Sequence, residues 1–291
     1  MTMISTGTLI VLLLNALLGI AIPVFLSWWA VKKHKARLST ILIGLGTFIV
    51  FALVLESLVH RLVLLGPHGA AIQGNTLYFA LYGGLMAGLF EETGRFLSMR
   101  YLLKDEPSAI KPAVAYGIGH GGMEMIAVFA LSMVSLLVIA IMVNTGTADT
   151  LLAKTPAEAQ QQLTAQIDQI KTASTGSYLF GLWERLSALT LHVGLSILVW
   201  VAVRKGGKWL WLFPAAILLH AFVDFLAVIL SKSVGMLGLE VIVTVLALLI
   251  AGIAWLAARA ACPGVTMESS HPQLPETDQD HGHGNDEGQG V

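Results

Sequence analysis

The chain has 291 residues, of which 56% are hydrophobic and 12% charged, and its formal net charge is −1. A mean hydropathy of +0.77 excludes an ordinary soluble domain, because the apolar segments are too many and too long for a soluble core. The charge balance gives no sign of a nucleic acid partner, and the single Cys262 excludes an intramolecular disulfide and a CxxC metal or redox site.

Seven apolar segments are each long enough to cross a bilayer as an α-helix. They cover residues 7–31, 39–65, 76–100, 112–143, 177–203, 209–231 and 235–259. The first has no basic region before it and no small-residue cleavage site, which favours a retained span over a signal peptide. The sequence therefore predicts an all-α, polytopic membrane helix bundle of about seven transmembrane helices.

Basic residues in the loops predict the orientation of this bundle. One side carries Lys32, Lys33, Lys35, Arg37, Arg100, Lys104, Lys111, Arg204, Lys205, Lys208 and Arg259, whereas the other carries Lys154, Lys171 and Lys232. Cytoplasmic loops of membrane proteins are enriched in Lys and Arg. We therefore expect the N-terminus outside, the C-terminus in the cytoplasm, and the protein in the plasma membrane, the inner membrane of a bacterium.

Two segments are expected to lie outside the spans of the membrane domain, which covers residues 1–261. In the outer loop 144–176, a short polar stretch with Pro156 at its start predicts a solvated surface helix. Residues 262–291 are polar, rich in glycine and poor in apolar side chains, so we expect a disordered cytoplasmic tail.

The third span contains Glu91, Glu92 and Arg95 within an otherwise apolar stretch. A charged residue at the centre of a membrane helix costs roughly 2.5–3.5 kcal/mol on insertion scales, so such residues usually face the interior of a bundle and have a function. The next three spans each carry a histidine. The fourth span has His120 with Glu124 four residues later, the fifth has His192, and the sixth has His220 with Asp224 four residues later.

Counting from the cytoplasmic end of each helix places these groups at one depth. Glu91 lies 9 residues from Arg100 and His120 lies 9 from Lys111, while His192 and His220 each lie 12 from a basic residue. At about 1.5 Å per residue, all four are roughly 13–18 Å from the cytoplasmic boundary. Four polar groups from four helices in one layer predict a common site.

Helical spacing predicts partners within each span, since residues four apart share a face. On this basis Arg95 pairs with Glu91 while Glu92 points elsewhere, and Glu124 and Asp224 orient His120 and His220. A second polar set lies near the outer face and consists of Glu56, His60, Arg61, Glu184 and Arg185. We expect these residues to form salt bridges between the second and fifth spans, the alternative being a gate or a brace for the deeper site.

Three kinds of chemistry fit the deep layer. In the first, a glutamate activates water, the histidines stabilise an oxyanion and Arg95 anchors the charge of the glutamate pair. In the second, His120, His192 and His220 bind zinc and a glutamate acts on the bound water. The third is proton or ion translocation, because transporters also use chains of buried carboxylates and histidines.

The order Glu-Glu-x-x-Arg, His-x-x-x-Glu, a mid-span His and His-x-x-x-Asp resembles the YhfC family of intramembrane proteases, which is related to the CAAX-protease/bacteriocin-processing and PrsW families. The resemblance covers about residues 5–260. Its motifs match Glu91, Glu92 and Arg95, then His120 and Glu124, His192, and finally His220 and Asp224. The chain lacks His-Glu-x-x-His, which argues against a zinc protease of the site-2 type.

The resemblance implies a membrane peptidase in which Glu91 or Glu92 is the water-activating base, Glu91 being favoured, and in which histidines assist. It favours a reaction without a metal over zinc catalysis with the same residues, and both over a proton-coupled transporter or an immunity-type membrane protein. The expected partners are a membrane protein or peptide substrate and the lipid bilayer, with no nucleic acid.

Overall fold

A computed structural model describes residues 3–261, and the predicted disordered tail at 262–291 lies outside them. In this part of the chain all regular structure is helical. The membrane-crossing candidates are α1 (Thr6–Lys32), α2 with η1 and α3 (Leu38–Leu64), α6 with η3 and α7 (Lys111–Asn144), α10 (Ser177–Lys205), η4 with α11 (Gly207–Leu230), and α12 (Met236–Ala261). These six helices confirm a polytopic helical membrane bundle.

The helix α5 (Thr76–Leu97), continued by η2 (Ser98–Leu102), corresponds to the predicted third span. It is absent from the six candidates chosen by length and apolar composition, and it is the helix that carries Glu91, Glu92 and Arg95. Its first turn is capped by Asn75, whose side chain accepts hydrogen bonds from two backbone N–H groups. The total of seven spans and the orientation of the termini therefore remain predictions.

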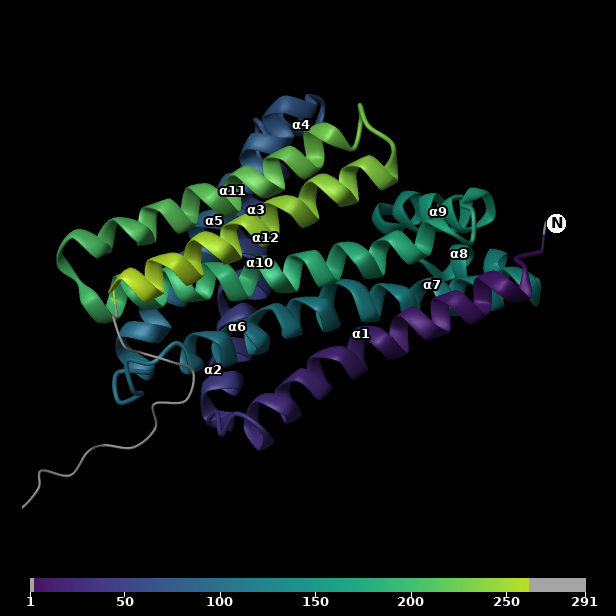
Figure 1. Ribbon diagram of the computed structural model, residues 1–291. Helices are drawn as coiled ribbons and strands as arrows, with labels where there is room; N and C mark the ends of the chain where they lie inside the picture. Colours follow the sequence, from purple (N-terminus) through teal and green to yellow (C-terminus); the bar gives the residue numbers. More distant parts are fainter. Residues whose placement is uncertain (1–2, 262–291) are drawn as a thin grey trace, which may run out of the picture.

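Helix α10 is the centre of the bundle. It is the most enclosed of the membrane-spanning candidates and packs against α6, α11 and α12 (Figure 1). Around it, α5 packs on α11, α2 packs on α6, and α1 packs on α7. Because α10 touches helices on several sides, a polar side chain in its middle meets residues from distant parts of the sequence.

Glycines allow the helices around α10 to approach closely. A Cβ atom on Gly119 of α6 would overlap the backbone carbonyl of Ile41 in α2, and one on Gly44 would overlap that of Tyr116. On α5, Gly84 and Gly88 lie equally close to the backbone of α11. This agrees with the close helix approach that small residues permit in membranes.

Three helical segments are wound as π-helix: η1 (Ile49–Glu56), η2 (Ser98–Leu102) and η3 (Met125–Ala130). Such turns are rare and frequently occur at functional sites. Here Glu124 directly precedes η3, and Arg95 lies within one turn of η2. The irregular backbone of the fourth span therefore begins just after its polar motif.

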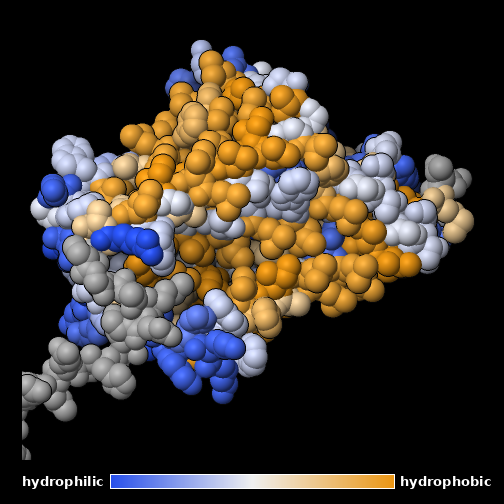
Figure 2. Space-filling model, viewed as in Figure 1, coloured by the Kyte–Doolittle hydropathy of each residue, from blue (hydrophilic) through white to orange (hydrophobic). Residues whose placement is uncertain are grey.

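The outer loop folds into α8 (Ala148–Lys154) and α9 (Ala157–Thr172). The polar helix predicted with Pro156 at its start corresponds to α9, whereas α8 was not predicted. Helix α9 is largely exposed but packs Ile167 and Ile170 against α7. A short helix, α4 (Gly69–Gln73), precedes α5. Hydrophobic side chains cover most of the molecular face in Figure 2, whereas hydrophilic ones gather towards its ends, as expected for a protein surrounded by lipid.

Candidate active site

The centre of the polar layer is a fully buried ion pair within α5. Arg95 donates from one terminal nitrogen to both carboxylate oxygens of Glu92, at 2.7 and 2.9 Å. The predicted pairing of Arg95 with Glu91 is therefore wrong. A helix brings residues three and four apart equally near, and Arg95 takes the partner at i−3. Glu91 is thereby left free to face other helices.

Arg95 and Glu92 also hold two of the three histidines. The Nδ1–H group of His220 donates to Glu92 Oε1 at 2.9 Å, which leaves the Nε2 lone pair of His220 available. The second terminal nitrogen of Arg95 donates to His192 Nδ1 at 3.0 Å. Since a guanidinium can only donate, His192 Nδ1 is an acceptor in this arrangement.

Each remaining carboxylate also contacts a histidine from a different helix. His120 Nε2 lies 2.9 Å from Glu91 Oε2, so His120 donates to Glu91. Glu124 forms an ion-pair contact with His192 Nε2. The prediction that Glu124 orients His120 is therefore wrong, because Glu124 turns towards α10 and His120 towards α5.

Asp224 keeps the expected neighbour, since its carboxylate lies 3.6 Å from His220 Nε2. That separation is an ion-pair distance and too long for a good hydrogen bond. The firmer hold on His220 comes from Glu92. Asp224 is also the most open member of the layer, with a side chain 39% exposed.

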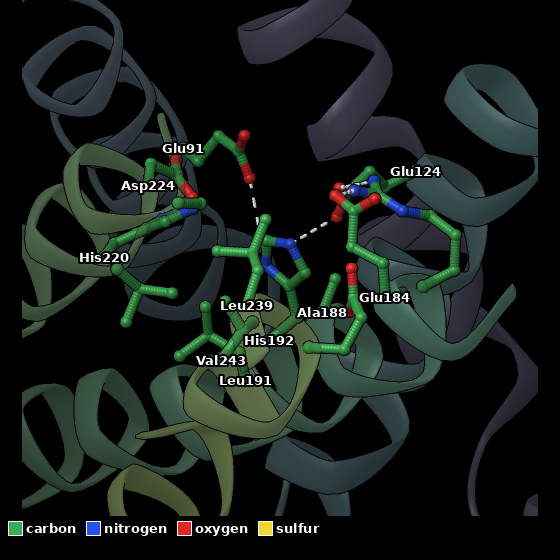
Figure 3. Close-up of a pocket in the computed structure, with 14 residues that line it drawn as sticks. Glu91, Glu124, Glu184, Ala188, Leu191, His192, His220, Asp224, Leu239 and Val243 are labelled. Carbon is green, nitrogen blue, oxygen red and sulfur yellow. Dashed lines mark hydrogen bonds and ion pairs between the residues drawn. The ribbon is translucent and has the colours of Figure 1, made fainter. Parts of the chain in front are cut away.

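The three imidazoles lie side by side, as their common depth predicted. The ring centres of His120 and His192 are 5.1 Å apart, and those of His192 and His220 are 5.2 Å apart. Figure 3 shows His192 between Glu91 and Glu124, with His220 and Asp224 on the same side of His192 as Glu91. The structure thus brings the sequence-predicted residues of four helices into one cluster.

A cavity of about 110 Å³ opens beside this cluster and has room for several water molecules. Glu91, Glu124, His192, His220 and Asp224 line it, whereas Glu92, Arg95 and His120 do not. The polar layer therefore has two parts. One faces the cavity and can meet a substrate, and the other lies behind it and holds the first in place.

The outer polar residues, Glu56, His60, Arg61, Glu184 and Arg185, do not form the predicted salt bridges between the second and fifth spans. No ion pair joins the second and fifth spans among the described residues: Glu56 contacts His60 in its own helix, and Arg185 contacts Glu124 and Glu184. Arg185 therefore braces the deep site through Glu124, the alternative role considered for this set. The sequence signal was present, because Arg185 precedes His192 by two helical turns and so shares its face.

One group of side chains has the donor set of a metal site. Ligand atoms of Glu91, His192 and His220 all lie within 4.8 Å of one another, and each residue is buried. Two imidazoles and one carboxylate are a common zinc donor set. The set differs from the three histidines considered from sequence, because Glu91 takes the place of His120.

Carboxylates behind the two histidines strengthen the fit to zinc. His220 is bound through Nδ1 by Glu92, and His192 contacts Glu124 through Nε2. Histidine ligands are usually held in this way, by a hydrogen bond from the nitrogen that does not bind the metal. The residues present therefore fit a zinc ion, provided that His192 Nδ1 releases its bond to Arg95.

Residues 18–247 match the family described as YhfC intramembrane metalloprotease. The membrane protein YhfC of Bacillus subtilis (strain 168) is 34% identical over 250 residues, which cover 85% of this chain and 95% of that protein. No solved structure matches the chain. The family description agrees with the zinc alternative and gives no support to the metal-free reaction that the sequence favoured.

Proposed function

This chain belongs to the YhfC intramembrane metalloprotease family, and from that premise we propose that it hydrolyses peptide bonds of a membrane-associated substrate in the plasma membrane. The observation that carries the proposal is the convergence of Glu91, His192 and His220 at the wall of a cavity that has room for several water molecules. Hydrolysis within a membrane needs such an enclosed polar space, because the surrounding lipid offers no water.

Glu91, His192 and His220 would hold the zinc ion that the family description implies. When bound, zinc supplies Lewis-acid chemistry, polarising a carbonyl and making water easier to deprotonate. The protein's own residues determine the position of the ligands. Glu92 fixes the orientation of His220, Arg95 neutralises Glu92, and Glu124 fixes His192 with Arg185 behind it.

His120 has a different part in this proposal. It donates to Glu91 Oε2 and so restricts the rotation of the Glu91 carboxylate, while its other nitrogen, Nδ1, is buried without a partner. It does not line the cavity. We therefore assign His120 to positioning Glu91, and Asp224 to the open wall of the cavity beside His220.

A second candidate is the same hydrolysis without a metal, with Glu91 as the base that takes a proton from water. One hydrogen bond favours it, because Arg95 donates to His192 Nδ1, the nitrogen that would bind zinc. Both candidates give Glu91 the central role. They differ in whether zinc is present, which metal analysis of the purified protein decides.

Comparative proteomics of membranes tests the peptidase proposal even while the substrate is unidentified. Strains would carry the wild-type protein, Glu91→Gln, or Glu56→Gln as a control that replaces a buried carboxylate outside the cavity lining. We expect at least one membrane protein to be cleaved in the wild-type and control strains and intact in the Glu91→Gln strain. If the three strains give the same membrane peptides, the peptidase proposal fails.

A further inference from the structure

Glu240 is a buried carboxylate that the proposed reaction does not use. It lies in α12, is 5% exposed, and lines the same cavity as Glu91 and His192. Its Oε2 atom has no hydrogen-bond partner, and no ion pair reaches its carboxylate within the described part of the chain. Burying a carboxylate is costly unless a cation or hydrogen-bond donors compensate it.

The polar groups nearest to Glu240 along α12 do not provide that compensation. Thr244 donates its hydroxyl to the backbone carbonyl of Glu240 and not to the side chain. The same hydroxyl oxygen accepts from Trp183 and pairs with Ser187 on α10. This seam between α10 and α12 fixes the backbone of Glu240 and leaves its carboxylate directed to the cavity.

The charges around the cavity are strongly unequal. Five carboxylates line it, from Glu91, Glu124, Glu184, Asp224 and Glu240. The basic groups in the lining are the guanidinium of Arg185 and the imidazoles of His192 and His220, which Glu124 and Glu92 already engage. Arg185 is already engaged by Glu124 and Glu184. A zinc ion at the histidine cluster would use Glu91, and Asp224 lies near His220. Glu240 lines the same cavity, and no ion pair engages its carboxylate among the described residues.

We propose that Glu240, with the half-exposed Glu184 on the same cavity, forms a subsite for a cationic nitrogen group of the substrate. The group is the ammonium or guanidinium of a lysine or arginine side chain, or a free amino terminus. The inference deepens the proposed function and rests on it, because it takes the occupant of the cavity to be the peptide. The subsite selects peptides with a positive charge near the bond that is cleaved.

A binding experiment tests the subsite without any turnover. The full chain in detergent micelles is titrated with n-hexylammonium or with n-hexanol, and thermal unfolding reports the binding. We expect the ammonium to stabilise the wild type and the alcohol to have no comparable effect. Glu240→Gln should weaken the affinity for the ammonium about tenfold, as loss of a charged partner does, whereas Glu56→Gln should leave this affinity unchanged. Glu240→Asp keeps the charge and should keep most of the binding.

Cleavage of synthetic peptides then identifies the source of the cation. Two apolar peptides differ at one position, which is lysine in the first and glutamine in the second. Each is made with a free and with an acetylated amino terminus, which gives four peptides. Loss of preference on lysine replacement assigns the subsite to a side chain, and loss on acetylation assigns it to the terminus. In either case Glu240→Gln should remove the preference mainly through KM.

Equal binding of the ammonium and the alcohol, or unchanged ammonium binding by Glu240→Gln, would overturn the subsite. So would equal cleavage of all four peptides by the wild type. Ammonium binding with no cleavage of any peptide would leave the cation site standing and would count against the proposed function. The two proposals can therefore fail separately.

Discussion

At the scale of single residues, the two adjacent glutamates of α5 differ in their surroundings. Glu92 is completely enclosed, accepts two hydrogen bonds from Arg95, and holds His220. Glu91 is bound by His120 on one side and faces the cavity on the other. These contacts support a structural role for Glu92 and a chemical role for Glu91.

Replacing Glu92 tests its structural role. Glu92→Gln leaves Arg95 buried without a counter-charge, and breaking a buried ion pair in this way costs about 3–5 kcal/mol. We expect a large fall in the thermal unfolding temperature in micelles, together with loss of activity. Unchanged stability would show that the pair contributes little to the fold.

Replacing Glu91 tests its chemical role. Glu91→Gln keeps the shape of the side chain and removes its charge, so it would lose a zinc ligand or, in the metal-free candidate, the base. We expect cleavage to fall by at least about 100-fold, the lower range for loss of acid–base catalysis. With metal removed from both proteins by a chelator, its unfolding temperature should stay close to that of the wild type, because Arg95 is satisfied by Glu92. Activity would be measured on the substrate found by proteomics, and a turnover near that of the wild type would remove Glu91 from the reaction.

Sequence reasoning found the members of this cluster but not all of their partners. The depth of Glu91, His120, His192 and His220 follows from counting residues, since the rise of a helix is fixed. The partner of Arg95 does not follow, because residues three and four apart are equally within reach. Glu124 binding His192 depends on how α6 and α10 are rotated against each other, which no local pattern encodes.

At the scale of helices, the predicted bounds of all seven apolar segments lie within two residues of helix ends in the structure. Apolar length and the basic residues at the helix ends determine these bounds. The π-helical turns were not predicted, because apolar length and loop charge locate a span but do not indicate how its turns are wound. The close approach of α2 to α6, by contrast, follows from glycines visible in the sequence.

Two glycine substitutions test this approach. Gly119→Ala places a methyl group against the Ile41 backbone and should destabilise the protein by about 1–3 kcal/mol, the usual cost of overpacking. In α5, Gly83→Ala meets no atom within 4 Å and should be neutral or slightly stabilising. Thermal unfolding of both variants in micelles gives the comparison, and equal effects would mean that α2 and α6 can separate without cost.

At the scale of the whole molecule, the predicted orientation can be tested with the single native cysteine. Because the C-terminus is expected in the cytoplasm, a membrane-impermeant maleimide should label Cys262 in inside-out vesicles but not in intact cells. In the double substitution C262S/Q161C, the cysteine lies in the exposed part of α9, and the labelling should be reversed. The opposite pattern for both proteins would invert the orientation.

The arrangement of the whole bundle encloses one site by means of helices that are far apart in the sequence. Glu91 comes from α5, His192 from α10, and His220 from α11, and α10 lies at the centre of the bundle (Figure 1). The metal-dependent account requires these three residues to act together on one ion. It therefore predicts that metal content and peptide cleavage are lost together.

The most direct measurement determines zinc content and peptide cleavage in the same purified preparations. For the wild type we predict about one zinc per chain and cleavage that a chelator abolishes and added zinc restores. Glu91→Gln and His220→Gln should lose both zinc and cleavage, whereas Glu56→Gln should keep both. Cleavage by a wild-type protein that contains no zinc would contradict the metal-dependent account.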